Sequence, residues 1–115
     1  MIEAWQDVPG YEGLYRVSSF GNVYSCKRNR PLKSHDNGSG HLVVLLYKDR
    51  KPKTHPVHRL VAGAFIPNPD NHPIVHHRDD NPRNNRADNL MWCTQKENVH
   101  YTIVAGKHGT MGRRK

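Results

Sequence analysis

The chain has 115 residues, of which 35% are hydrophobic, so its length and composition predict one domain, or two very small ones, around a small core. A formal net charge of +8 favours a polyanionic partner, because Lys and Arg displace the counterions condensed on nucleic acid. No apolar run approaches a membrane span and the first residues lack an apolar leader, which predicts a soluble, unexported protein with no membrane partner.

The two cysteines carry little information. Cys26 and Cys93 are far apart and neither belongs to a CxxC pair. The expected state is two reduced thiols in a cytoplasmic protein. A small zinc-stabilised binding module, built from Cys93 and histidines, is a weaker alternative that bound zinc in the purified protein would reveal.

The first half of the chain predicts short antiparallel β-hairpins. Residues 14–18 alternate apolar and polar side chains, and the turn Phe20-Gly21-Asn22 leads into a second strand at 23–26. The aromatic side chains of this part are expected to complete the core rather than to stack on bases: Trp5, Tyr11 and Tyr15.

Two basic segments accompany the hairpins. Residues 27–33 (KRNRPLK) predict a solvated loop, and the basic turn KDRKPK follows the most hydrophobic strand signal, at 41–47, and leads into a strand at 53–57. Cations of this kind contact phosphates and position a protein on DNA without specifying sequence. The DNA-binding candidates here are Lys27, Arg28, Arg30, Lys33, Arg50 and Lys51.

Helical spacing begins near Val57 and ends before Pro67, with apolar residues on one face at 60, 61, 64 and 65. Residues 68–73 are expected to be a linker. Apart from the pair at 76 and 77, the histidines show no ligand spacing, so surface or packing roles are expected for His35, His41, His55, His58, His72, His100 and His108.

Residues 75–101 hold the candidate site. An apolar run ends at His76 and His77, a polar loop broken by Pro82 follows, and a strand is expected at 90–93. A helix is then expected to begin at Thr94, with a glutamate at the capping-box spacing. The predicted order is strand, loop, strand, helix.

A helix packed across this hairpin would bring His76, His77 and Asn98 together. An imidazole nitrogen and an amide oxygen can both bind a divalent cation. A second histidine, with an ordinary pKa of about 6.5, can take a proton from water near neutral pH. One ring is therefore expected to bind metal while its neighbour activates water.

The segment resembles the HNH endonucleases of bacteriophages and group I introns. Three patterns of that family occur here in order: V-D/H-H-x-D-x-N at 75–81, N-N-x-x-x-N-L at 84–90 and K-E-N at 96–98. The resemblance implies an α+β fold in which short antiparallel N-terminal β-hairpins and a short helix precede a ββα-metal (HNH) motif.

The resemblance also implies roles by position. His76 would be the first metal ligand, Asn98 the second and His77 the general base, while Asn89 would hold the loop and orient the His77 ring. One divalent ion is implied, Mg²⁺ or Mn²⁺. Histidine in place of the aspartate frequent at position 76 also favours softer ions such as Zn²⁺ or Ni²⁺.

Residues 10–23 resemble the small module that precedes the HNH segment in phage nucleases, with the pattern G-Y-E-G-x-Y-x-V-S-x-x-G-x-V. In that family the module is associated with DNA contact. The expected organisation is therefore an N-terminal module at 1–56, an HNH core with its leading helix at 57–105 and a disordered basic tail at 106–115.

The predicted function is metal-dependent hydrolysis of phosphodiester bonds in double-stranded DNA, by nicking or by double-strand cleavage. Arg78, Arg83 and Arg86 are candidates for holding the scissile phosphate, and a role in solubilising the loop is equally compatible with them. The alternative is a DNA-binding protein that keeps the fold without cutting. Monomer and homodimer both stay open, and a phage-encoded protein would act in the host cytoplasm.

Overall fold

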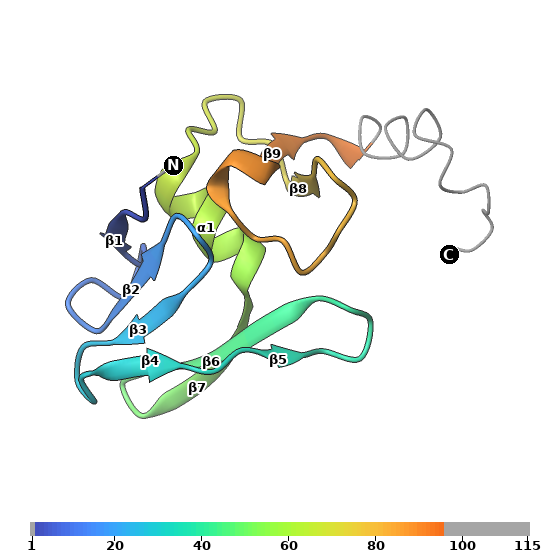
Figure 1. The fold of residues 1–115 in the computed structure, drawn as a ribbon. Coiled ribbons are helices and arrows are strands. Elements are labelled where there is room, and N and C mark those ends of the chain that lie inside the picture. The colour runs from blue at the N-terminus through green and yellow to red at the C-terminus, as the bar shows by residue number, and fades with distance from the viewer. Residues whose placement is uncertain (1, 96–115) are drawn as a thin grey trace.

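The computed structural model of the chain describes residues 2–95. These residues form three antiparallel sheets, in the orders β1-β2-β3-β4, β5-β6-β7 and β8-β9 (Figure 1). The elements are β1 (Trp5–Asp7), β2 (Tyr15–Ser18), β3 (Val23–Ser25), β4 (Arg30–Leu32), β5 (His35–Asp36), β6 (Leu42–Lys48), β7 (Lys51–Pro56), α1 (Val57–Phe65), β8 (Ile74–His77), the 3-10 helix η1 (Ala87–Asn89) and β9 (Leu90–Cys93).

The predicted N-terminal hairpin is confirmed. Val17 of β2 pairs with Val23 of β3, and the amide of Ser18 donates to the carbonyl of Asn22 across the turn. The prediction of a loop at 27–33 is wrong for residues 30–32, which form β4. Asn29 closes a turn with φ of +54°, and Pro31, which has no amide donor, is tolerated because β4 is an edge strand.

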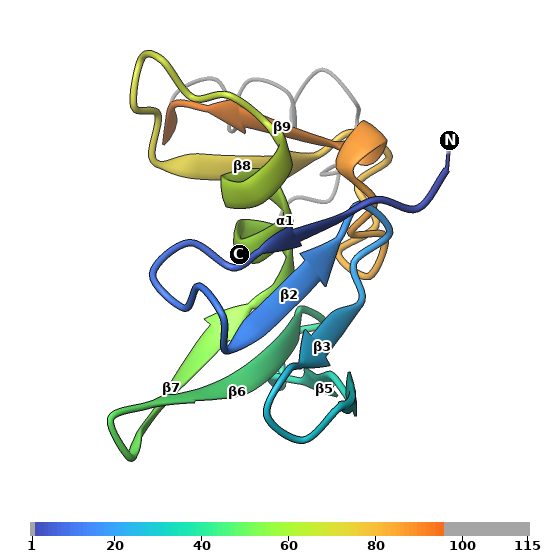
Figure 2. The ribbon, with the colours of Figure 1, turned by 90° about the vertical axis from the view of Figure 1, so that its left-hand side faces the viewer.

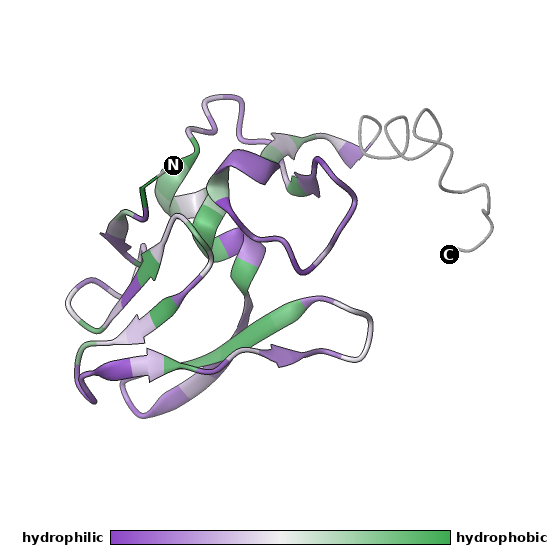
Figure 3. Cartoon of the chain, viewed as in Figure 1, coloured by the Kyte–Doolittle hydropathy of each residue, from purple (hydrophilic) through white to green (hydrophobic). Residues whose placement is uncertain are grey.

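The second predicted hairpin is also confirmed and lies between β6 and β7. Val44 and Leu46 are buried while the alternate residues Leu45 and Tyr47 are exposed, as the two-residue period of a strand requires. Asp49 and Arg50 both have positive φ, which is typical of the tight turns that join twisted hairpin strands. Figure 3 shows β6 as a hydrophobic strand beside hydrophilic turns.

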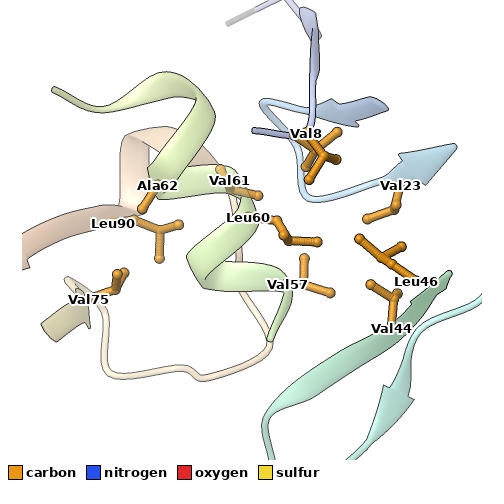
Figure 4. Close-up of a cluster of buried hydrophobic side chains, with 11 residues drawn as sticks. Val8, Val23, Val44, Leu46, Val57, Leu60, Val61, Ala62, Val75 and Leu90 are labelled. Atoms are coloured by element: carbon orange, nitrogen blue, oxygen red, sulfur yellow. The ribbon is translucent and has the colours of Figure 1, made fainter. Parts of the chain in front are cut away.

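Helix α1 joins the three sheets. It contacts β1 and β2, then β6 and β7, and also β8 and β9 (Figure 2). Its buried residues are Val57, Leu60, Val61 and Ala62, and they meet valines and leucines from both halves of the chain (Figure 4). Helix propensity alone does not stabilise nine residues, so the helix depends on this packing.

The expected placement of the N-terminal aromatics holds for two of the three residues. Tyr11 and Tyr15 pack against the core. Trp5 does not, and 42% of its surface is exposed. The reason is that Trp5 lies on β1, an edge strand whose three residues are all exposed, where its ring meets the Tyr24 ring edge-on.

Of the predicted C-terminal helix only Thr94 and Gln95 belong to the described residues, and the rest of it, with Asn98 and the tail at 106–115, lies outside them. Among residues 2–95, no helix is long and apolar enough to cross a membrane.

Helix α1 also carries a titratable side chain into the interior. The Nδ1 atom of His58 is buried and has no hydrogen-bond partner among the described residues. Burial, helped by the neighbouring rings of His77 and His41, lowers the pKa of His58 to about 4. The folded chain therefore holds His58 uncharged at neutral pH.

This burial predicts a loss of stability in acid. Between the ordinary histidine pKa of about 6.5 and the folded pKa of about 4, the unfolded chain binds a proton at His58 and the folded chain does not. The free energy of unfolding should therefore decrease as the pH is lowered. This group contributes at most about 1.4 kcal/mol per pH unit, and its contribution is smaller than that limit because the ring is partly exposed.

Urea unfolding of His58→Gln between about pH 7 and pH 4.5 should show a smaller slope of stability against pH than the wild type. His35→Gln, a substitution of an exposed histidine on β5, is the control and should keep the wild-type slope. Equal slopes for wild type and His58→Gln would contradict the prediction.

Candidate active site

Strand β8 delivers the two adjacent histidines. His76 pairs with Met91 and His77 with Leu90 of β9, and neighbouring residues on a strand point to opposite faces. The two side chains accordingly have different surroundings. His77 faces helix α1, where its ring centroid lies 5.2 Å from that of His58, whereas Nε2 of His76 lies 4.0 Å from a carboxylate oxygen of Asp80.

The His77 ring is held by a buried hydrogen bond. Its Nε2 lies 2.8 Å from Oδ1 of Asn85, and the exposed fractions of the two residues are 7% and 4%. With the amide oxygen as acceptor, the neutral ring carries its proton on Nε2 and keeps the lone pair of Nδ1. Burial lowers the pKa of His77, and the hydrogen bond that its ring donates to Asn85 acts in the opposite direction. A neutral ring with one free lone pair can act as a base.

Asp79 organises the loop that follows β8. Its carboxylate accepts hydrogen bonds from the amide of Asn81 and from the side chains of Asn84 and Asn89, at 2.8, 2.8 and 2.9 Å. Oδ1 of Asn89 in turn accepts from the amide of Asp79 at 3.1 Å. These bonds lower the pKa of Asp79 to about 2, so its carboxylate is charged throughout the physiological range.

Asn89 therefore holds the loop, as the sequence predicts, but its contacts differ from the prediction in one respect. Its side chain bonds Asp79 and the carbonyl of Asn84, and the partner that accepts the described hydrogen bond of the His77 ring is Asn85 instead. The physical reason is that the amide of Asn89 is already used within the loop. Sequence reasoning missed Asn85, and the only signal for it was the paired asparagine at 84–85.

Two further histidines surround His77. The ring centroid of His41, on the loop before β6, lies 6.0 Å from that of His77 and 5.4 Å from that of His58. His58, for which a surface or packing role was expected, packs beside His77 because α1 contacts β8. Among residues 2–95, no group of three His, Cys, Asp or Glu side chains is arranged to hold a metal ion.

His76 is the described residue whose chemistry suits a divalent cation. Its side chain is 11% exposed, and with Asp80 it places an imidazole nitrogen and a carboxylate oxygen close together at the end of β8. Both atoms are ordinary ligands of divalent ions. The second ligand expected from the sequence, Asn98, lies outside the described residues.

Part of the predicted basic set gathers at one pocket. Lys27, Arg28 and Arg50 line a pocket of about 380 Å³, together with Lys48, which the sequence analysis did not select. Its lining residues come mainly from the segments around the β3–β4 and β6–β7 turns. The β6–β7 turn lies at the end of the molecule away from β8 and β9 (Figure 2). The remaining candidates of the basic set are exposed, and no side-chain partner is described for them within residues 2–95: Arg30, Lys33, Lys51 and Arg78.

Two arginines of the segment that follows β8, Arg83 and Arg86, hold this loop against the rest of the protein. Arg83 forms an ion pair with Asp36 of β5. The guanidinium of Arg86 lies 4.1 Å from the centroid of the Phe20 ring and 3.6 Å from Asp88. These contacts support the loop, which is a role different from the two expected from the sequence, phosphate binding and solubilising the loop.

Comparison with known proteins agrees with this geometry. Residues 3–47 match the family model of the NUMOD4 motif, and residues 55–109 match that of an HNH endonuclease. The chain is 43% identical over 102 residues to DNA endonuclease I-HmuI of Bacillus phage SP01, covering 89% of this chain and 59% of that protein. It is 33% identical over 116 residues to H-N-H endonuclease F-TflII of Escherichia phage T5, covering 99% and 59%.

Two further relatives extend the comparison. The uncharacterised HNH endonuclease L245 of Acanthamoeba polyphaga mimivirus is 39% identical over 89 residues, covering 77% of this chain and 27% of its own length. A solved structure, described as DNA binding and cleavage by the HNH homing endonuclease I-HmuI, superposes with a TM-score of 0.85 and covers 90% of this chain and 59% of that one. This chain thus spans between about a quarter and three fifths of these relatives.

The expected resemblance and fold class are therefore confirmed. The chain, whose N-terminal antiparallel strands precede the hairpin that carries His76 and His77, has the fold of the solved HNH structure at 43% identity. With its NUMOD4 motif ahead of the HNH segment, this chain belongs to the HNH endonuclease family.

Proposed function

We propose that this chain hydrolyses phosphodiester bonds in double-stranded DNA, with His77 as the general base. The observation that carries the proposal is the buried hydrogen bond between His77 and Asn85, which leaves Nδ1 of a neutral ring as the proton acceptor. The names of the relatives, which include DNA endonucleases of two phages, support the same activity.

In this hydrolysis the residues of the chain have different roles. Nδ1 of His77 takes a proton from a water molecule, whose oxygen attacks the phosphorus in line with the departing 3′ oxygen. The imidazolium formed still donates from Nε2 to Asn85, so the ring keeps its orientation through proton transfer. Asp79 and Asn89 keep the loop folded, which maintains the end of β8.

HNH endonucleases generally depend on a divalent metal ion. In this chain we assign its binding to His76, with Asp80 beside it and Asn98 as the amide ligand; Mg²⁺ or Mn²⁺ is favoured, and the imidazole also permits Zn²⁺ or Ni²⁺. When bound, the ion supplies positive charge next to the phosphate as negative charge develops there.

We assign DNA contact to the basic pocket formed by Lys27, Arg28, Lys48 and Arg50. Four cations against one carboxylate, Asp49, in the pocket lining leave a net positive surface that suits a phosphate backbone. The distance of these cations from β8 and β9 favours positioning over chemistry. Arg83 and Arg86, being bound to Asp36 and Phe20, are assigned to loop support.

Supercoiled plasmid incubated with the purified chain and Mg²⁺ or Mn²⁺ should be converted to open circle or linear DNA. His77→Ala should slow this conversion by about 100-fold or more, because a positioned base contributes roughly 10²–10⁴ in rate. DNA affinity should stay near that of the wild type. A His77→Ala protein that cleaves at the wild-type rate would remove His77 as the base, and His35→Ala serves as the control for an exposed histidine.

Removal of the metal should separate cleavage from binding. EDTA should stop plasmid cleavage, while a mobility-shift assay should still detect bound DNA, since the basic pocket needs no ion. Asn98→Ala should move the metal titration of cleavage to higher concentration, because an amide ligand is lost. A titration curve that coincides with the wild type would contradict the assignment of Asn98.

The basic pocket should appear in the salt dependence of DNA binding. In the double variant Arg28→Ala with Arg50→Ala, the slope of log affinity against log salt should be smaller by about 2, because each phosphate contact contributes roughly 0.9. Lys53→Ala, an exposed lysine of β7 that does not line the pocket, is the control and should change the slope by less. An unchanged slope in the double variant would exclude the pocket as a DNA contact.

A further inference from the structure

The residue that holds the His77 ring belongs to no strand or helix. Asn85 lies in the segment between β8 and η1, yet only 4% of its surface is exposed. A buried polar network specifies one geometry only when its members are fixed in place. The support of Asn85 therefore has to come from neighbouring parts of the chain.

Gly21, in the turn between β2 and β3, packs directly on Asn85. A Cβ atom added to Gly21 would lie 3.1 Å from Cβ of Asn85 and 3.2 Å from its carbonyl oxygen. Gly21 also has φ of +93°, a conformation that side chains rarely adopt. The glycine is thus required both by the backbone of the turn and by the contact that the turn makes.

Two further contacts join the residues next to Asn85 to the residues next to Gly21. The amide of Ala87 donates to the carbonyl of Ser19 at 2.7 Å, and the guanidinium of Arg86 stacks on the ring of Phe20. Three successive residues of the loop, 85–87, therefore contact three successive residues of the turn, 19–21. A shift of Asn85 away from the His77 ring would have to break this set of contacts together.

The turn is itself held rigid by Ser18, which is fully buried. The Ser18 hydroxyl oxygen accepts hydrogen bonds from the amides of Phe20 and Asn22, both at 3.1 Å. The carbonyl of Ser18 accepts from the amide of Gly21 at 3.0 Å. A turn with this many internal bonds is a fixed surface against which a loop can pack.

We propose that the turn Ser18–Asn22 of the N-terminal module positions the candidate general base, by fixing Asn85 against the His77 ring. Asn85 and Gly21 are then positioning residues. The N-terminal module contributes to the rate of cleavage and not only to DNA contact. This inference deepens the proposed function and rests on it, since it takes His77 as the base.

Asn85→Leu removes the acceptor and keeps a side chain of similar size, whereas Asn85→Asp keeps an acceptor oxygen. In the full chain, single-turnover cleavage by Asn85→Leu should be slower by roughly 10- to 100-fold, with DNA affinity unchanged. Asn85→Asp should recover most of that rate. Nitrogen-15 NMR of the His77 ring should show the proton on Nε2 in the wild type and in Asn85→Asp, and a mixture of tautomers in Asn85→Leu.

Gly21→Ala tests the support supplied by the turn, with Gly13→Ala as its matched control. Both glycines have positive φ, +93° and +80°, but an added Cβ at Gly13 meets nothing within 4 Å. If both variants keep the wild-type circular dichroism spectrum, Gly21→Ala alone should slow cleavage and disturb the His77 tautomer. Equal effects of the two variants would overturn the proposal, because backbone strain alone would then explain them.

The failure of this inference is distinguishable from the failure of the proposed function. An Asn85→Leu protein that cleaves like the wild type and keeps the Nε2 proton would overturn the inference while leaving the nuclease intact. A wild-type chain that cuts no DNA with any of the four metals would overturn the proposed function. The NMR comparison still decides in that case whether Asn85 and Gly21 fix the ring.

Discussion

The hydrogen bond between His77 and Asn85 is the constraint on which the rest of the candidate site depends. Each partner is buried, and an unpaired polar group in that position would carry a desolvation cost of about 1–3 kcal/mol. The bond fixes which nitrogen of the ring is free. Because Asn85 has no strand to hold it, that constraint extends to the loop and to the turn at Gly21, so the two halves of the chain have to be built together.

Helix α1 is the second element that makes the halves inseparable. Residues 2–95 build one hydrophobic cluster, as expected for so small a chain, and the helix lies at its centre. The face of α1 that fills the cluster also brings His58 against His77. The surroundings of the candidate base are therefore a consequence of core packing, and they keep the neighbouring ring uncharged at neutral pH.

Burial also determines where the positive charge of the protein lies. In the interior beside His77 the groups that could be charged are histidines, and burial lowers the pKa of two of them, His58 and His77. Two arginines of the loop, Arg83 and Arg86, are engaged with Asp36 and with the Phe20 ring. The cations around the 380 Å³ pocket are exposed and are solvated by water. A bound polyanion would replace that water.

The sequence alone determined the hairpins, helix α1, the strand that ends at His76 and His77, and the family, because these features are local periodicities and short motifs with fixed spacing. It could not separate β4 from a basic loop, since pairing with β3 rather than composition made residues 30–32 a strand. Nor could it select Asn85, Gly21, His41 or His58 from a chain rich in asparagine, glycine and histidine. Their proximity arises from contacts between residues far apart in sequence, and only the tertiary structure brings those residues together.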